Sequence, residues 1–341
     1  MTVPATTAVP GPRVSRGSAL VGSPVLRLVV KRLLMAIPIL LGVTALAFWV
    51  LSLIPGNAAQ QLLGPEATPE QVHQLEQQLG LDKPGIVRYL DWLKGAVHGD
   101  FGKSLVSGQP VSELLPGRLG VTGELVFLAF FVSLAVAIPV ALLAARRPNG
   151  VVDRLSMMIG TAGLSVANYV LALVLVLIFA VGLGWLPAIG YEPLSSGLWA
   201  NLKTMILPSA AIGIPLFCFY GRFLRSDLVD QMQGEDYITT AQAKGLGPWQ
   251  VLVRHAFRNS SFGLITVVGL NLGTLIGGTV IIEQIFALPG LGQLLLQSIN
   301  TRDFVVVLAA VVIFAVVAVL ANLIVDLLYA VLDPRIRYGS H

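Results

Sequence analysis

The residues that could do chemistry in this chain are few, and they are widely spaced. The sequence contains no Gly-x-x-x-x-Gly-Lys-Ser/Thr phosphate loop, no Gly-x-Ser-x-Gly nucleophile turn and no Cys/His cluster with the spacing of zinc ligands. The four histidines are far apart and lie outside the long apolar runs: His73, His98, His255 and His341. We therefore expect no catalytic residue, no metal site and no cofactor.

Ionisable side chains inside membrane segments are the first candidates for function, because burying them in hydrocarbon is costly. The apolar runs of this chain hold almost none, apart from Glu283 and Asp326 near the ends of two runs. A proton-coupled carrier or a membrane enzyme would usually place carboxylates or histidines near the bilayer midplane. The sequence therefore disfavours both classes.

The composition of the chain suits lipid rather than water. Hydrophobic residues make up 55% and charged residues 12% of the 341 residues, and the mean hydropathy is +0.80. A soluble domain carries about 25% charged residues. The net charge is only +4, with basic residues near the ends of apolar runs, which argues against a nucleic-acid partner. The single cysteine, Cys218, cannot form an intrachain disulfide and is most simply a packing residue.

A helix needs about 20 apolar residues to cross the hydrocarbon core of a bilayer. Pro208 and Pro215 should kink one of the spans, because proline removes a backbone donor. Residues 1–24 are predicted to be a disordered cytoplasmic tail, ahead of a transmembrane domain at 25–341. The sequence predicts six spans: Leu33–Ile54, Leu125–Ala145, a helix near Gly160–Gly182 within the run Leu155–Tyr191, Thr204–Tyr220, Ser260–Ile282 and Phe304–Val325.

Basic residues indicate how these spans are oriented. Six spans place both termini on one side of the membrane, and Lys/Arg in short loops favour the cytoplasm. Arg32 precedes the first span, and Arg146 and Arg147 end the second. We therefore expect both termini and the segment 222–259 to be cytoplasmic, and the segment 55–120 to be extracytoplasmic.

The segment 55–120 is polar enough to form a small helical cap. Thr68, Pro69 and Gln71 are typical of a helix start, Gly80 is a plausible stop, and a second short helix is expected after Pro84. The cap is either a spacer or part of a docking surface for an outside partner, and the sequence leaves both open.

Glycine recurs at every fourth position in the fifth span. Gly269, Gly273 and Gly277 share one helix face, and Asn271 lies between the first two. Glycine lets another helix approach closely. This face indicates either packing inside the subunit or a contact with another subunit or the pore.

The most informative segment lies between the fourth and fifth spans. Asp236–Ala243 suits a short helix along the membrane surface, and Gly245 permits a left-handed turn after it. Pro248–Arg258 suits a second, basic helix that returns to the membrane. A structured cytoplasmic loop of this length suits docking to a soluble partner, and an ordinary amphipathic connector is the alternative.

This segment resembles the EAA loop of ABC importer permeases, whose general pattern is E-A-A-x-x-x-G. Thr239, Thr240 and Ala241 take the first three places and Gly245 takes the last. The version E-D-Y-x-x-T-A-x-A-K-G-L, followed by R-H-A-x-R-N, is similar to the B-type subunit of oligopeptide and dipeptide permeases. The matching residues are Glu235, Asp236, Tyr237, Thr240, Ala241, Ala243, Lys244 and Gly245, and then Arg254, His255, Ala256, Arg258 and Asn259.

The resemblance extends from about Leu26 to Gly339. It includes Gly99-Asp100-Phe101-Gly102, Pro289-Gly290-Leu291-Gly292 and Asp333-Pro334-Arg335. One departure is Ala167, where the family commonly has proline, and it puts a kink in the third span in doubt.

The resemblance implies a type I ABC importer permease fold in a bacterial cell membrane. It implies a pathway shared with a second, C-type permease, ABC ATPase subunits that bind the cytoplasmic loop, and an extracytoplasmic binding protein that delivers di- or oligopeptides. The matching residues from Glu235 to Gly245 would then couple the permease to the ATPase. The alternatives are a carrier or channel working alone and a membrane-embedded enzyme, which the missing midplane carboxylates and catalytic motifs disfavour.

Overall fold

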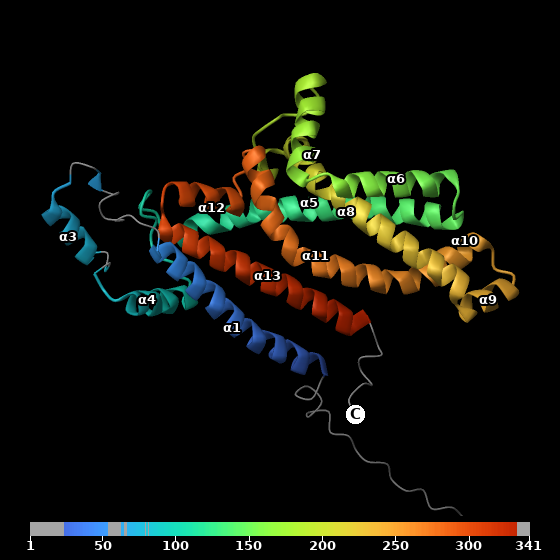
Figure 1. Cartoon of the computed structure of the whole chain (residues 1–341), viewed down its shortest axis with the longest axis horizontal. Helices are drawn as coiled ribbons and strands as arrows, with labels where there is room; N and C mark the ends of the chain where they lie inside the picture. The colour runs from blue at the N-terminus through green and yellow to red at the C-terminus, as the bar shows by residue number, and fades with distance from the viewer. Residues whose placement is uncertain (1–23, 54–62, 65–66, 79, 81, 333–341) are drawn as a thin grey trace, which may run out of the picture.

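The computed structural model describes residues 24–53, 63–64, 67–78, 80 and 82–332, and every regular element among them is helical (Figure 1). The long helices are α1 (Pro24–Leu53), α5 (Val111–Arg146), α8 (Leu198–Gly234), α11 (Phe257–Ile285) and α13 (Phe304–Leu332). The shorter elements are α3 (Pro69–Gln78), α4 (Gly85–Val97), α6 (Val151–Ser165), α7 (Asn168–Leu175), α9 (Asp236–Ala243), α10 (Pro248–Val251), α12 (Leu291–Asn300), the π-helical turns η1 (Val176–Gly182) and η3 (Leu252–Ala256), and the 3-10 turn η2 (Leu194–Ser196). The predicted tail, except Pro24, and the motif that begins at Asp333 lie outside the described residues.

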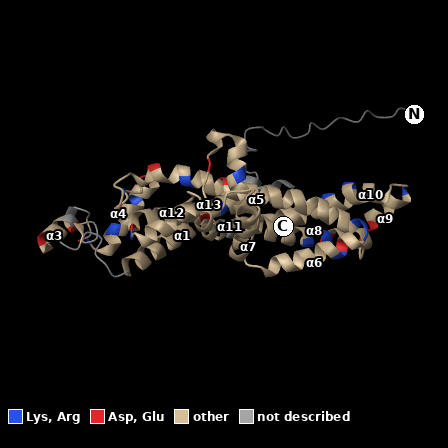
Figure 2. Ribbon diagram, turned by 90° about the horizontal axis from the view of Figure 1, so that it is seen from above, with Lys and Arg blue, Asp and Glu red and all other residues tan. Residues whose placement is uncertain are grey.

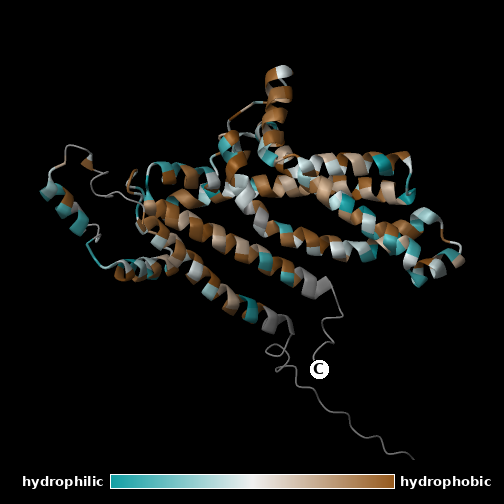
Figure 3. Ribbon diagram, viewed as in Figure 1, coloured by the Kyte–Doolittle hydropathy of each residue, from teal (hydrophilic) through white to brown (hydrophobic). Residues whose placement is uncertain are grey.

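Four helices are each long and apolar enough to cross a membrane: α1, α5, α8 and α13. Two bent pairs supply the others. α6 meets α7 and η1 at 105°, and Pro248–Gly273 meets Gly277–Ile285 at 64°. Apolar residues run along these helices, whereas charged residues gather toward the two ends of the molecule (Figures 2 and 3). The all-helical membrane fold with six spans is confirmed, each bent pair counting as one span.

The packing of α5 against α8 forms the centre of the fold (Figure 1). Alanine recurs on the buried side of α5, including Ala129, Ala137 and Ala141. On α8, Gly213 lies so close that an added Cβ would come within 3.1 Å of the Ala129 carbonyl oxygen. Small side chains thus let the two helices approach closely, which is how helices associate in lipid.

α8 runs as one unbroken helix through Pro208 and Pro215, the two residues at which the sequence predicts a kink. Pro208 and its neighbour Ile212 are buried in the helical core. Packing against adjacent helices supports a membrane helix where proline removes a donor. α8 also continues past the predicted end of the span, so that residues 222–234 of the predicted cytoplasmic loop are helical.

The third span is broken, and the predicted helix near Gly160–Gly182 is wrong. α6 ends at Ser165, Val166 and Ala167 are extended, and α7 begins at Asn168. Ala167 has φ −67° and ψ 142°, a conformation close to that of polyproline II. A kink therefore occurs without proline, because alanine adopts the same backbone angles.

The polar segment before α5 is held by one local set of hydrogen bonds and by one set that joins it to the rest of the fold. Thr68 and Gln71 form the predicted capping box, in which each side chain accepts from the other residue's backbone N–H. Ser104 donates to the buried carboxylate of Asp303, which also accepts from the N–H of Leu105 at 3.2 Å. These bonds tie the segment to the turn between α12 and α13. α5 already begins at Val111, inside the range that we assigned to the extracytoplasmic loop.

Candidate functional site

Helix α9 has the predicted bounds, Asp236–Ala243, and lies with α10 at the end of the molecule opposite α3 and α4 (Figure 1). Its inner side belongs to the core, since Ile238 and Ala241 are 2% and 5% exposed. Thr239 and Gln242 on its outer side are exposed. α9 therefore rests on the end of the helical bundle and leaves its other side exposed.

The matching residues from Glu235 to Gly245 divide into two groups by burial. Ala241 is buried and Tyr237 is half-buried, so these two hold α9 in place. The others are exposed on the chain and available for contact: Glu235, Asp236, Thr240, Ala243, Lys244 and Gly245.

Tyr237 connects α9 to the two long helices that flank the loop. Its hydroxyl donates to the side-chain oxygen of Gln231 on α8, and it also hydrogen-bonds the side chain of Asn259 on α11. Burial raises the pKa of Tyr237, and the nearby carboxylates of Glu235 and Asp227 add to the shift. The hydroxyl thus stays protonated at neutral pH and remains a hydrogen-bond donor.

Gly245 ends α9 in a left-handed turn, as predicted. Its φ is +82°, its N–H donates to the carbonyl of Gln242 at 2.9 Å, and the N–H of Leu246 reaches the carbonyl of Ala241 at 3.4 Å. This is the usual glycine-terminated helix end. No atom lies within 4 Å of the position that a Cβ would take. Glycine is therefore required here by the backbone angle and not by lack of space within this chain.

The predicted second helix, Pro248–Arg258, is not a separate element. α10 begins at Pro248, the chain passes through the π-helical turn η3, and it continues directly into α11. The guanidinium of Arg146, at the end of α5, lies 5.8 Å from the centre of the Trp249 ring. The loop is thereby joined to α5, α8 and α11.

Asp153 and Arg225 form a buried ion pair that the sequence analysis missed. The Arg225 guanidinium donates two hydrogen bonds to the Asp153 carboxylate, at 2.7 and 2.6 Å, and the N–H of Asn149 donates a third at 2.7 Å. The side chain of Asp153 is 3% exposed. The pair fixes the start of α6 to α8 near the loop. The only sequence signal was a lone acidic residue just before the third apolar run.

The three glycines on one face of α11 differ in how closely other helices approach them. A Cβ on Gly269 would collide with Val325 of α13, and one on Gly273 would lie 3.6 Å from the Asn322 side chain. A Cβ on Gly277 would meet no atom within 4 Å. Asn271, between the first two glycines, donates to the carbonyl of Val267 on its own helix at 2.9 Å. The first two glycines face α13, whereas the third is open in this chain.

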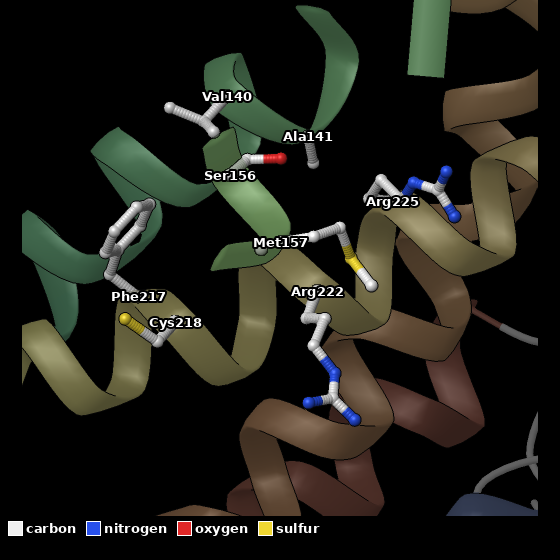
Figure 4. Close-up of a pocket in the computed structure, with 9 residues that line it drawn as sticks. Val140, Ala141, Ser156, Met157, Phe217, Cys218, Arg222 and Arg225 are labelled. Atoms are coloured by element: carbon white, nitrogen blue, oxygen red, sulfur yellow. The ribbon is translucent and has the colours of Figure 1, made fainter. Parts of the chain in front are cut away.

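A small cavity lies between α5, α6 and α8 beside Cys218 (Figure 4). It has a volume of about 10 Å³, room for one water molecule at most. Cys218 is buried, and a Cβ on Gly163 would collide with its sulfur atom. The cysteine therefore packs two helices together, as expected. Among the described residues, no group of three His, Cys, Asp or Glu side chains could hold a metal ion.

Glu283, which the sequence analysis noted as an ionisable residue near the end of a span, has a structural role. It is fully buried where α11 ends. Its carboxylate accepts from the Thr122 hydroxyl of α5 at 2.7 Å and from the N–H of Gln293 at 3.0 Å. An added Cβ on Gly290 or Gly292 would collide with it or press closely against it. A carboxylate at the start of α12 suits the positive end of that helix. Glu283 thus fixes α5, α11 and α12 to one another.

Six spans with a short helix held at one end of them are consistent with a membrane transport subunit. Two family models match the chain: residues 137–338 match the binding-protein-dependent transport system inner membrane component, and residues 25–125 match the N-terminal part of such membrane components. The chain belongs to this family of inner membrane components, and it is therefore a multi-pass membrane subunit of a binding-protein-dependent transport system.

Curated relatives resemble the chain over almost its whole length. A putative peptide transport system permease protein of Brucella abortus is 40% identical over 311 residues, which cover 91% of this chain and 99% of the relative. The oligopeptide transport system permease protein AppB of Bacillus subtilis is 39% identical, with 91% and 99% covered. The glutathione transport system permease protein GsiC of Escherichia coli is 37% identical, with 92% and 99% covered.

Proposed function

We propose that the chain is the B-type permease of an ATP-driven importer for di- or oligopeptides. The relatives are named for transport of peptides, oligopeptides and glutathione, which is itself a short peptide. Their identity to this chain extends over 91–92% of its length, which supports a related substrate class. The partners in this proposal are a second, C-type permease, ABC ATPase subunits and an extracytoplasmic binding protein.

The main structural support for the proposal is that α9 is fixed to the helical core on one side and exposed on the other. Its inner residues Ile238 and Ala241 are anchored in the core, Tyr237 hydrogen-bonds both flanking helices, and its outer side is exposed. A partner that pushes on such a helix moves α8 and α11 with it. Since the sequence has no phosphate loop, ATP hydrolysis belongs to the partner. The exposed members of the set from Glu235 to Gly245 are then the coupling contacts.

Reconstitution tests the proposal. The chain is purified with its partner permease, ATPase subunits and binding protein, and uptake of labelled dipeptide, longer peptide and glutathione is measured in proteoliposomes. We expect uptake that needs both ATP and the loaded binding protein. Uptake by the chain alone without ATP would refute the coupling role, whereas ATP-dependent uptake of a non-peptide only would refute the substrate class.

The proposed topology places both termini and α9 in the cytoplasm and α3 outside. Gln77 on α3 and Gln242 on α9 are both exposed. Each is replaced by cysteine in a Cys218→Ser background, and intact cells are treated with a membrane-impermeant thiol reagent. Labelling at position 77 and not at 242 is expected, and the reverse pattern would invert the topology.

A further inference from the structure

Helix α4 carries an apolar stripe that nothing in the described chain covers. Ile86, Leu90 and Val97 are 63%, 55% and 77% exposed. Their spacing of four and seven residues places them along one side of the helix. In water, three large apolar side chains exposed along about three turns would favour association with another surface.

The adjacent side of α4 is fixed to α1. The Tyr89 hydroxyl lies 2.8 Å from the Thr44 hydroxyl and 3.3 Å from the carbonyl oxygen of Leu41. The Tyr89 ring packs on Phe48, with centroids 5.5 Å apart, and the Arg88 guanidinium lies over the same ring. Thr44 is 3% exposed as a result. α4 is therefore bound to the side of a membrane-spanning helix.

These contacts place α4 at the level of the membrane. Thr44 lies nine positions before Leu53, the last residue of α1, which is about 14 Å along the helix. The hydrocarbon core is about 30 Å thick. The Tyr89 hydroxyl thus contacts α1 well inside the span, and a helix so anchored lies against lipid in the half of the bilayer on the α3 side.

Aromatic and charged residues agree with this depth. The Trp49 ring of α1, 47% exposed, lies within 3.5 Å of where a Gly85 Cβ would be. Tryptophan and tyrosine are enriched where a membrane meets water. Asp91 pairs with Lys83 at 3.2 Å, and both side chains are more than half exposed. α4 thus has a polar side for headgroups and water beside its apolar stripe.

We infer that the apolar stripe Ile86, Leu90 and Val97 of α4 lies against the acyl chains of the leaflet on the α3 side, so that α4 is a membrane-embedded interfacial helix. Lipid is the occupant that the structure favours, because the stripe begins beside the exposed Trp49 and continues the apolar surface of α1, where Leu46 and Val50 are also exposed. Such helices bind through buried apolar area. The inference requires only that α1 crosses the membrane, and it is independent of the proposed substrate and coupling loop.

Spin-label accessibility tests this inference in the assembled transporter, reconstituted in liposomes of phosphatidylethanolamine and phosphatidylglycerol. Single nitroxide labels are placed by Leu90→Cys and Val97→Cys in a Cys218→Ala background. Asp91→Cys on the same helix is the matched polar control, and Leu46→Cys on α1 is the lipid-facing reference. Collision rates are measured with oxygen, which concentrates in lipid, and with a nickel chelate, which stays in water.

We expect the ratio of oxygen to nickel collisions at positions 90 and 97 to approach that at position 46 and to exceed that at position 91 several-fold. If the nickel chelate collides with labels at positions 90 and 97 as often as with the label at 91, the apolar stripe lies in water and the inference is overturned. Low access to both reagents would show that protein covers the stripe, and would overturn it equally. Because Val97 is the most exposed of the three, its label carries the test if Leu90→Cys fails to assemble.

Discussion

The left-handed turn at Gly245 allows a sharp test of the coupling loop. Gly245→Ala places a side chain on a residue whose φ is +82°, although no atom lies within 4 Å of the new Cβ. The change therefore adds backbone strain and no collision within this chain. Holding a residue other than glycine in this region costs about 1–2 kcal/mol. The ratio of loops with the native turn to loops with other conformations should then fall by about 5- to 30-fold.

Gly247→Ala is the matched control, since Gly247 lies two residues away. Its backbone is extended, with φ −67° and ψ 153°, and its Cβ position is also open. Alanine is relaxed there, so this variant should behave like the native chain. Gly245→Asn should fall between the two alanine variants, because asparagine tolerates left-handed angles better than alanine does.

The assay is stimulation of ATPase activity by the loaded binding protein, together with uptake, in complexes shown to be intact by size-exclusion chromatography. We expect both activities to fall steeply in Gly245→Ala and to be unchanged in Gly247→Ala. Equal activity of the two alanine variants in intact complexes would refute the argument that the turn positions α9 for coupling. Equal losses in both would show that the loop tolerates no side chain there, and would refute the strain argument.

Three further outcomes follow from the packing. Ala241→Asp should detach α9 from the core, because Ala241 is 5% exposed and a buried unpaired charge is costly, and limited proteolysis of the loop should accelerate. Asp153→Asn should leave the Arg225 guanidinium without its counter-charge and destabilise the subunit by about 3 kcal/mol, measured as a lowered Tm; an unchanged Tm would show that the pair is dispensable. Gly269→Ala should reduce stability and expression, because its Cβ would collide with α13, whereas Gly277→Ala should leave the isolated subunit unaffected; the opposite order would contradict the packing described for α11.

The positions of the spans could be predicted from the sequence, whereas the break in the third span could not. Hydropathy located every span, because the length of an apolar run reflects only the thickness of the bilayer. It failed to place the break at Ala167, since alanine carries no signal for an extended backbone. Pro208 and Pro215 do not end α8, because neighbouring helices support a membrane helix where proline removes a donor.

The sequence by itself determined the membrane class, the number of spans, the bounds of α9 and the left-handed turn at Gly245, because these depend on local composition and on backbone angles that one residue type prefers. Tertiary structure decided the rest. The Asp153–Arg225 pair, the burial of Glu283 and the anchoring of α4 by Tyr89 join residues that are far apart in the chain. Hydropathy and spacing describe single segments, whereas which side of each helix meets a neighbour is set only when all the helices pack together.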